Sequence, residues 1–127
     1  MPRRLLLQTA GLLMAAVVLA GMVAVAAAQG NPEAARLQNP TPASAESLAA
    51  GEKIYMRHCR ACHGKAGDGG LGPSLIDATW DYGSTDGEIF TVIQKGTGPR
   101  MEAWADRIEA PETWNLVNFI RSLAKPQ

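Results

Sequence analysis

Two cysteines and a histidine form the most informative cluster of reactive side chains in this sequence. Residues 59–63 are Cys-Arg-Ala-Cys-His, and Cys59 and Cys62 are the only cysteines in the chain. Two thiols at this spacing can add across the two vinyl groups on one edge of a porphyrin and form thioethers. The histidine after the second thiol then offers an imidazole nitrogen to the iron. The pattern therefore predicts one covalently bound haem c, attached through Cys59 and Cys62, with His63 as an axial iron ligand.

Three other chemistries use the same side chains. A disulfide between Cys59 and Cys62 would close a very short loop and add little stability. A structural zinc site needs four Cys or His ligands, and His58 and His63 flank the cysteines too closely for the usual paired spacing. A thioredoxin-like redox pair needs a βαβ context, and no strand pattern lies nearby. The haem interpretation is favoured over all three.

The second iron ligand is the next question, because a haem that transfers electrons usually has both axial positions filled. Met56 lies on the predicted helix leading to Cys59 and cannot easily reach the opposite face of the ring. Met101 ends a non-helical stretch, residues 96–101, that can cover that face. A lone methionine is often core filler, but we predict that Met101 is the ligand opposite His63. This soft donor would raise the reduction potential and leave no open coordination site, as expected of an electron carrier rather than an enzyme.

Two helices on either side of the motif have clear start signals. Ser44 or Ser47 can cap a first helix that runs to about His58 and so delivers the first cysteine at its end. Residues 85–88, Thr-Asp-Gly-Glu, form a capping box. This box predicts a second helix that stops at Gly96.

The remaining segments are predicted to be a last helix and irregular loops, without strands. Pro111 suits the first turn of a last helix, which we expect to end near Pro126. Glycines are frequent in residues 64–73, which predicts irregular backbone around a flat ligand. Because no alternating strand pattern or internal repeat appears, we predict an all-α fold.

The N-terminal segment has the pattern of a secretory signal. Arg3 and Arg4 precede an apolar stretch, residues 5–28, that ends in three alanines. We therefore expect residues 1–28 to be a signal peptide and the mature protein to be periplasmic. Residues 10–28 have no charge and are numerous enough to span a bilayer. An uncleaved anchor, with the protein facing the periplasm, is the alternative.

Two segments remain after the signal. Residues 29–43 are rich in Pro, Ala, Asn and Gln and are expected to be a flexible leader, and residues 44–127 form one domain. Without Arg3 and Arg4 the twelve basic residues fall to ten against twelve acidic ones, a formal charge of −2. The sequence also has no basic stripe, so nucleic acid is not expected as a partner.

Several segments together resemble class I c-type cytochromes, the small monohaem electron carriers. Residues 51–55 and 59–64 look like the first helix and haem motif of that family, and residues 72–75, Gly-Pro-Ser-Leu, are similar to its G-P-x-L turn. Residues 116–123 are similar to its aromatic-bearing last helix. The likeness extends over residues 48–123. It implies a cytochrome c-like fold, in which several short helices surround one covalent haem and the N- and C-terminal helices cross.

The resemblance also implies particular contacts. The small Gly51 would let the first and last helices cross closely, and Tyr55 would pack near Leu116 and Phe119. The Pro73 carbonyl would accept the free ring N–H of the proximal histidine and so fix its tautomer.

One segment departs from the family pattern. The family often has Met-Pro, then a small residue and an aromatic, whereas this chain has Met101-Glu102-Ala103-Trp104. The missing proline predicts a less rigid loop with a carboxylate near the haem edge. Three further residues are candidates for contacts with the haem propionates: Trp80, Tyr82 and Arg100.

These observations favour a monomeric electron carrier that meets its redox partners through a small interface. The partners expected are a donor dehydrogenase or reductase and an acceptor oxidase, with a membrane involved only if residues 1–28 stay uncleaved. An alternative is a dedicated haem subunit or electron acceptor of a periplasmic quinoprotein dehydrogenase or a terminal oxidase, which residues 80–83 and 86–90 resemble. A sensor or enzyme with a labile distal ligand is a third hypothesis, supported by the missing proline alone.

Overall fold

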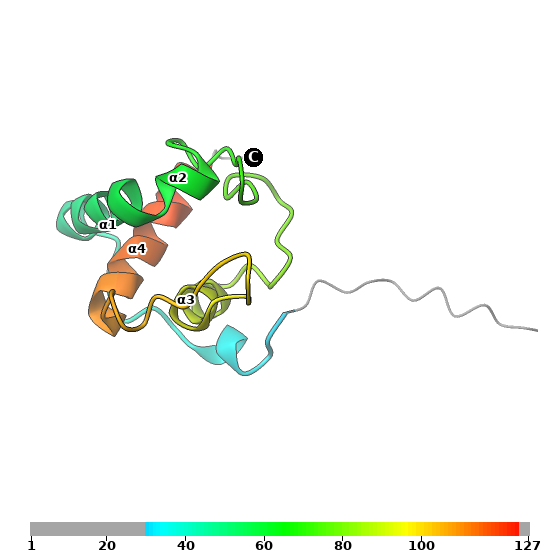
Figure 1. The fold of residues 1–127 in the computed structure, drawn as a ribbon. Helices are drawn as coiled ribbons and strands as arrows, with labels where there is room; N and C mark the ends of the chain where they lie inside the picture. The colour runs from blue at the N-terminus through cyan, green and yellow to red at the C-terminus, as the bar shows by residue number, and fades with distance from the viewer. Residues whose placement is uncertain (1–29, 125–127) are drawn as a thin grey trace, which may run out of the picture.

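The computed structural model describes residues 30–124, which form α-helices, a short 3-10 helix and connecting loops (Figure 1). The elements in order are η1 (Ala34–Arg36), α1 (Ala45–His58), α2 (Arg60–His63), α3 (Asp86–Lys95) and α4 (Ala110–Leu123). In this part of the chain there is no β-strand, and the only β-type pairing is an isolated bridge between Gly98 and Met101. The predicted all-α fold is confirmed. The signal peptide or anchor predicted for residues 1–28 lies outside the described residues.

The helices begin where their capping residues predict. The Ser44 hydroxyl accepts a hydrogen bond from the Ser47 amide at 3.1 Å, so Ser44 is the cap of α1. At the start of α3, the Thr85 amide donates to the Glu88 carboxylate at 3.0 Å, and the Glu88 amide donates to the Thr85 hydroxyl at 3.2 Å. This reciprocal capping box satisfies amides that have no partner inside the helix.

The helix ends also follow local signals. Gly96 ends α3 with φ +70, a left-handed conformation that glycine adopts without strain. Pro111 lies in the first turn of α4, as predicted, and this helix ends at Leu123. This end lies a few residues before Pro126, near which the sequence predicts it. Between residues 30 and 124, no helix is both long and apolar enough to cross a membrane.

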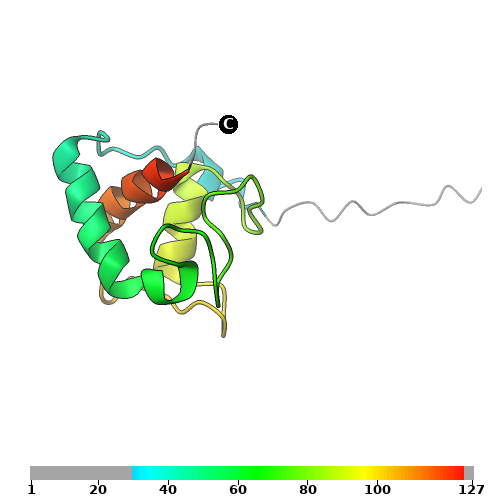
Figure 2. The ribbon, with the colours of Figure 1, turned by 90° about the horizontal axis from the view of Figure 1, so that it is seen from above.

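The first and last long helices, α1 and α4, cross each other (Figures 1 and 2), and Gly51 lies at their contact. A Cβ atom on Gly51 would overlap the Asn115 carbonyl and lie 2.7 Å from the Phe119 Cβ. One turn further along α1, the fully buried Tyr55 ring lies 5.3 Å from the Phe119 ring, centroid to centroid. The crossing and the packing of Tyr55 therefore confirm what the resemblance implied.

The hydrophobic core joins this crossing to α3 and to the loop before α4. Its side chains are apolar and at most 8% exposed. They are Tyr55, Ile89, Ile93, Ile108, Leu116, Val117, Phe119 and Ile120. Cys59 and Met101, which the sequence predicts to lie on the two sides of the haem, both pack against this core.

Residues 30–43, the N-terminal segment, differ from the flexible leader that their composition predicts. In Figures 1 and 2 this segment runs alongside α3 and then along α4. Ala34 is 3% exposed, and a Cβ on Gly87 would overlap its carbonyl oxygen. The Asn31 amide donates to the Glu88 carboxylate at 2.9 Å. The segment is therefore packed against the α3 N-terminus.

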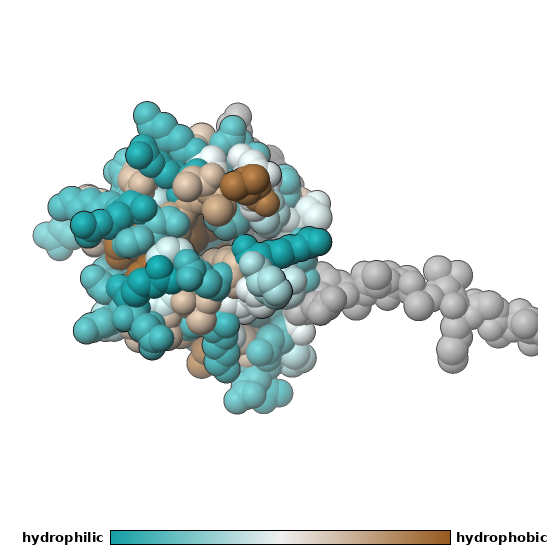
Figure 3. Space-filling view, viewed as in Figure 1, coloured by the Kyte–Doolittle hydropathy of each residue, from teal (hydrophilic) through white to brown (hydrophobic). Residues whose placement is uncertain are grey.

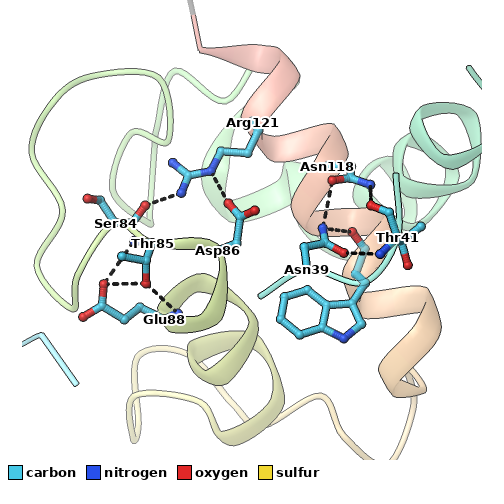
Figure 4. A network of polar contacts seen from close by, with 9 residues as sticks. Asn39, Thr41, Ser84, Thr85, Asp86, Glu88, Asn118 and Arg121 are labelled. Carbon is cyan, nitrogen blue, oxygen red and sulfur yellow. Dashed lines mark hydrogen bonds and ion pairs between the residues drawn. The ribbon is translucent and has the colours of Figure 1, made fainter. Parts of the chain in front are cut away.

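Side-chain amides attach the same segment to α4 (Figure 4). Asn39 Nδ2 donates to Asn118 Oδ1 at 2.8 Å, and Asn118 Nδ2 donates to the Thr41 carbonyl at 3.0 Å. Asn118 is 8% exposed, and its amide also donates to the Ser47 hydroxyl at 2.9 Å. Polar residues that suggested disorder instead form long-range hydrogen bonds, which composition alone does not reveal.

Candidate haem site

The Cys-x-x-Cys-His motif lies on one turn of helix at the end of α1. Cys59 directly follows α1 as its C-terminal cap, where its amide donates to the Tyr55 carbonyl at 2.9 Å, and the short helix α2 begins at the next residue. The amides of Cys62 and His63 both donate to the Cys59 carbonyl, at 3.2 and 3.0 Å. Residues three and four apart on a helical turn face the same side. The two thiols and the imidazole therefore belong to one face of this turn.

Both thiols are free in this structure. Cys59 is half-buried and Cys62 is exposed. Burial raises the pKa of the Cys59 thiol to about 11, with a smaller contribution from Cys62, so Cys59 is a protonated thiol at neutral pH. The disulfide alternative is thus not observed. Nor do residues 30–124 contain any group of three or more Cys, His, Asp or Glu side chains that could hold a metal ion, as the zinc alternative requires.

The His63 ring is oriented by the loop that follows α2. Its Nδ1 atom lies 2.9 Å from the Pro73 carbonyl oxygen. A carbonyl can only accept, so Nδ1 carries the shared proton, and in the neutral imidazole Nε2 then has a lone pair for a ligand bond. The contact that the resemblance implied is present, and such a bond orients a ligating imidazole and increases its basicity.

Glycines allow this loop to approach the histidine closely. A Cβ on Gly72 would lie 2.9 Å from the His63 Cε1 atom, so a side chain at this position would displace the ring. The Gly72 amide donates to the Cys62 carbonyl and the Gly69 amide to the His63 carbonyl, both at 2.8 Å. The loop is therefore attached to α2 by main-chain hydrogen bonds. We refer to residues 59–75 as the proximal segment.

Met101 lies in residues 96–109, the loop between α3 and α4, which we call the distal loop. It is half-buried and packs against the hydrophobic core, as Cys59 also does. The Thr97 amide donates to the Met101 carbonyl at 2.9 Å, which closes the turn that the methionine ends. Met56 is also half-buried against the core, but it lies within α1.

The three residues predicted to contact the haem propionates differ in their burial. Trp80 packs against the core, whereas Tyr82 is 41% exposed and Arg100 is exposed. Sequence reasoning missed Arg121, whose Nε donates to Asp86 at 2.7 Å and whose Nη2 donates to the Ser84 carbonyl (Figure 4). Arg121 thereby attaches the end of the loop after Pro73 to α4. No local pattern marks this ion pair, because its partners lie 35 positions apart.

These residues fit a covalently bound haem. Two free thiols and an imidazole with an available Nε2 share one helical turn, which is the donor set that haem c uses. Half-buried apolar side chains lie around the same core and suit a flat apolar ring: Leu75, Trp80, Phe90, Met101 and Trp104. On the face seen in Figure 3, hydrophobic residues lie in a hollow among hydrophilic side chains.

The fold and this donor set define a class I c-type cytochrome, with one covalent haem c. The family model described as "Cytochrome C oxidase, cbb3-type, subunit III" matches residues 46–120, which is more than half of the chain. The chain belongs to this family.

Relatives and solved structures agree with this assignment. The cbb3-type cytochrome c oxidase subunit FixP of Bradyrhizobium diazoefficiens is 35% identical over 78 residues, which are 59% of this chain and 27% of FixP. Cytochrome c-L of Methylorubrum extorquens is 33% identical over 75 residues, 58% of this chain and 38% of that protein. The crystal structure of cytochrome cL from Methylophaga aminisulfidivorans superposes with a TM-score of 0.62 at 29% identity, covering 69% of this chain and 58% of the other. The chain thus spans about a quarter to two fifths of the length of these two curated relatives.

Proposed function

We propose that this protein is a periplasmic electron carrier in which His63 and Met101 are the two axial ligands of the iron. Cys59 and Cys62 would form the thioethers, and the Pro73 carbonyl would hold the proximal imidazole in place. Haem c supplies one-electron chemistry, in which the iron alternates between Fe(II) and Fe(III). The side chains of this protein attach, orient and shield that group.

One observation supports this function most strongly: the hydrogen bond of 2.9 Å between His63 Nδ1 and the Pro73 oxygen. It leaves Nε2 as the nitrogen available to a metal, and it lies on the same turn as the two thiols. This tautomer suits a ligating imidazole, because the partner of the other ring nitrogen sets its orientation and basicity.

The distal ligand follows from chemistry and from position in the fold. Met101 is a soft thioether donor that favours Fe(II), and it lies in a loop packed against the same core as Cys59. With both axial positions filled, oxygen and peroxide would react slowly. The chain would then pass single electrons between a donor dehydrogenase or reductase and an acceptor oxidase, as a monomer. Location in the periplasm, free or anchored, is part of the proposal.

The test is a redox titration of the haem-loaded protein and its Met101→Ala variant. We expect the reduction potential to fall sharply in this variant, because the thioether no longer favours Fe(II). Met56→Ala is the matched control, since it removes the other half-buried methionine, which lies on α1. A potential unchanged by Met101→Ala, or lowered equally by Met56→Ala, would contradict Met101 as the ligand.

A second candidate function is a dedicated haem subunit or electron acceptor of a larger oxidoreductase. The observation that favours it is the match of residues 46–120 to a family model of an oxidase subunit. A terminal oxidase or a quinoprotein dehydrogenase would be the partner. Isolation of the native protein separates the two functions: a stable complex with such an enzyme supports a subunit, and a free monomer supports a shuttle.

A further inference from the structure

The distal loop is attached to α3 by its main chain. The Trp104 amide donates to the Ile93 carbonyl at 3.0 Å, and the Ala105 amide donates to the Gln94 carbonyl at 3.3 Å. The Thr97 amide closes the turn that ends at Met101. These bonds position the loop relative to α3. They do not join it to α1 or α2, where the proposed attachment cysteines and proximal histidine lie.

The side chain of Trp104 makes that connection. Its ring lies 5.1 Å from the His58 ring, centroid to centroid, at an interplanar angle of 54°. His58 is the last residue of α1 and directly precedes Cys59. Tilted aromatic pairs at this distance are attractive. Trp104 therefore connects the distal loop to the start of the proximal segment.

A charged residue covers the Trp104 ring as well. The guanidinium carbon of Arg107 lies 4.1 Å from the Trp104 ring centroid. The same guanidinium is paired with the Glu102 carboxylate at 2.7 Å, and Glu102 is the neighbour of Met101 in the chain. His58, Trp104, Arg107 and Glu102 thus form a continuous series of contacts from the end of α1 to the methionine. Glu102 occupies the position where the family often has proline.

We propose that Trp104 is a positioning residue for Met101. Its contacts with His58 and Arg107 keep the distal loop closed over the face of the haem that is opposite His63. These contacts replace the rigidity that a proline after Met101 would give. This inference rests on the proposed function, in which Met101 is an iron ligand. Loss of an aromatic pair together with a cation–π contact corresponds to about a tenfold shift in the equilibrium between closed and open loop.

The experiment uses the full-length, haem-loaded protein and measures two properties. One is the rate of carbon monoxide binding to the reduced protein, which requires the distal ligand to leave. The other is the methionine–iron charge-transfer band of the oxidised protein. In Trp104→Ala we expect binding about tenfold faster and a weaker band. Trp104→Phe, which keeps a ring in the same place, should restore most of the wild-type behaviour.

Trp114→Ala is the matched control. Trp114 is also half-buried, and its ring stacks on Phe90 at 4.0 Å within the packing of α3 and α4. Its removal should lower the thermal midpoint yet leave the carbon monoxide rate and the band close to wild type. The inference is overturned if Trp104→Ala behaves like the wild type, or if Trp114→Ala accelerates binding as much as Trp104→Ala does.

Met101→Ala separates this inference from the proposed function. If the wild type has the band and Met101→Ala lacks it, the ligation stands, and an unchanged Trp104→Ala then refutes the positioning role alone. If the wild type lacks the band and Met101→Ala behaves identically, the ligation itself is wrong and the role of Trp104 falls with it.

Discussion

The proximal segment and the distal loop differ in how they are held in place. In the proximal segment, the histidine and its supporting loop are fixed by main-chain hydrogen bonds and by close approaches that only glycine permits, as at Gly72. In the distal loop, the contact with the end of α1 is made by the side chain of Trp104. Main-chain contacts survive most substitutions, whereas a side-chain contact is lost with one. We therefore expect the geometry of the proximal segment to tolerate most substitutions outside its cysteines, its histidine and its closely packed glycines, and the geometry of the distal loop to change when one side chain is lost.

The largest effect should follow from removing both thiols. The double variant Cys59→Ala, Cys62→Ala has no group that can form a thioether, so we expect complete loss of covalent haem. Mass spectrometry of the denatured protein measures this directly. Met101→Ala is the comparison on the distal side and should keep the full haem mass. Haem mass in the double variant, or its loss in Met101→Ala, would contradict this division of roles.

A moderate effect is expected from one hydrogen bond on the proximal side. The hydroxyl of Tyr55 donates to the Gly64 carbonyl, directly after α2, at 2.7 Å. Burial, with smaller contributions from Cys59 and Asp68, raises the pKa of Tyr55 to about 12, so the phenol remains a donor at neutral pH. Tyr55→Phe should lower the free energy of unfolding by about 1 kcal/mol.

Denaturant unfolding of the haem-loaded protein checks this value. The exposed Tyr82 provides the control, because Tyr82→Phe should leave the free energy of unfolding unchanged. The methionine–iron band should be the same in both variants if the two sides are held independently. Equal stability of the Tyr55→Phe and Tyr82→Phe proteins would argue against a structural role for this bond.

The smallest expected effect is on the pH dependence of the free energy of unfolding. It comes from Glu88 at the start of α3, the helix that precedes the distal loop. Hydrogen bonds from the Thr85 amide, then the Thr85 hydroxyl and the Asn31 and Ser84 amides, lower the pKa of Glu88 from its ordinary 4.5 despite burial. A carboxyl with a lowered pKa in the folded state stabilises the fold above pH 4.5 and loses that contribution as the pH falls further. Glu88→Gln should therefore make the free energy of unfolding less dependent on pH in this acidic range.

The measurement is denaturant unfolding at a series of pH values from neutral to acidic. Glu52→Gln, on the exposed surface of α1, is the control and should keep the pH dependence of the wild type. The expectation fails if Glu88→Gln and Glu52→Gln lose stability with the same slope below pH 4.5.

Local signals explain what the sequence could predict. Ser44, the capping box from Thr85 to Glu88 and Gly96 set helix ends through contacts between residues a few positions apart. The motif of residues 59–63 is itself local, so its haem-attaching chemistry could be predicted from its spacing. Gly51 was predictable from the family resemblance, since a close helix crossing needs a small residue.

Long-range side-chain contacts explain what the sequence could not predict. Asn39 and Asn118 are 79 positions apart, and their hydrogen bond is part of what makes residues 30–43 a packed segment instead of a flexible leader. The stack of His58, Trp104 and Arg107 likewise needs the packing of α1 against the distal loop. The sequence places Met101 in a loop, but the contacts that position the loop appear only in three dimensions.

The most direct test of the central claim, ligation by His63 and Met101, is a visible absorption spectrum of the haem-loaded protein. It is recorded oxidised and reduced, and again after carbon monoxide is added to the reduced form. We predict a low-spin spectrum with the methionine–iron charge-transfer band and no prompt response to carbon monoxide. A high-spin spectrum that shifts readily with carbon monoxide would contradict a closed electron carrier and indicate an open iron.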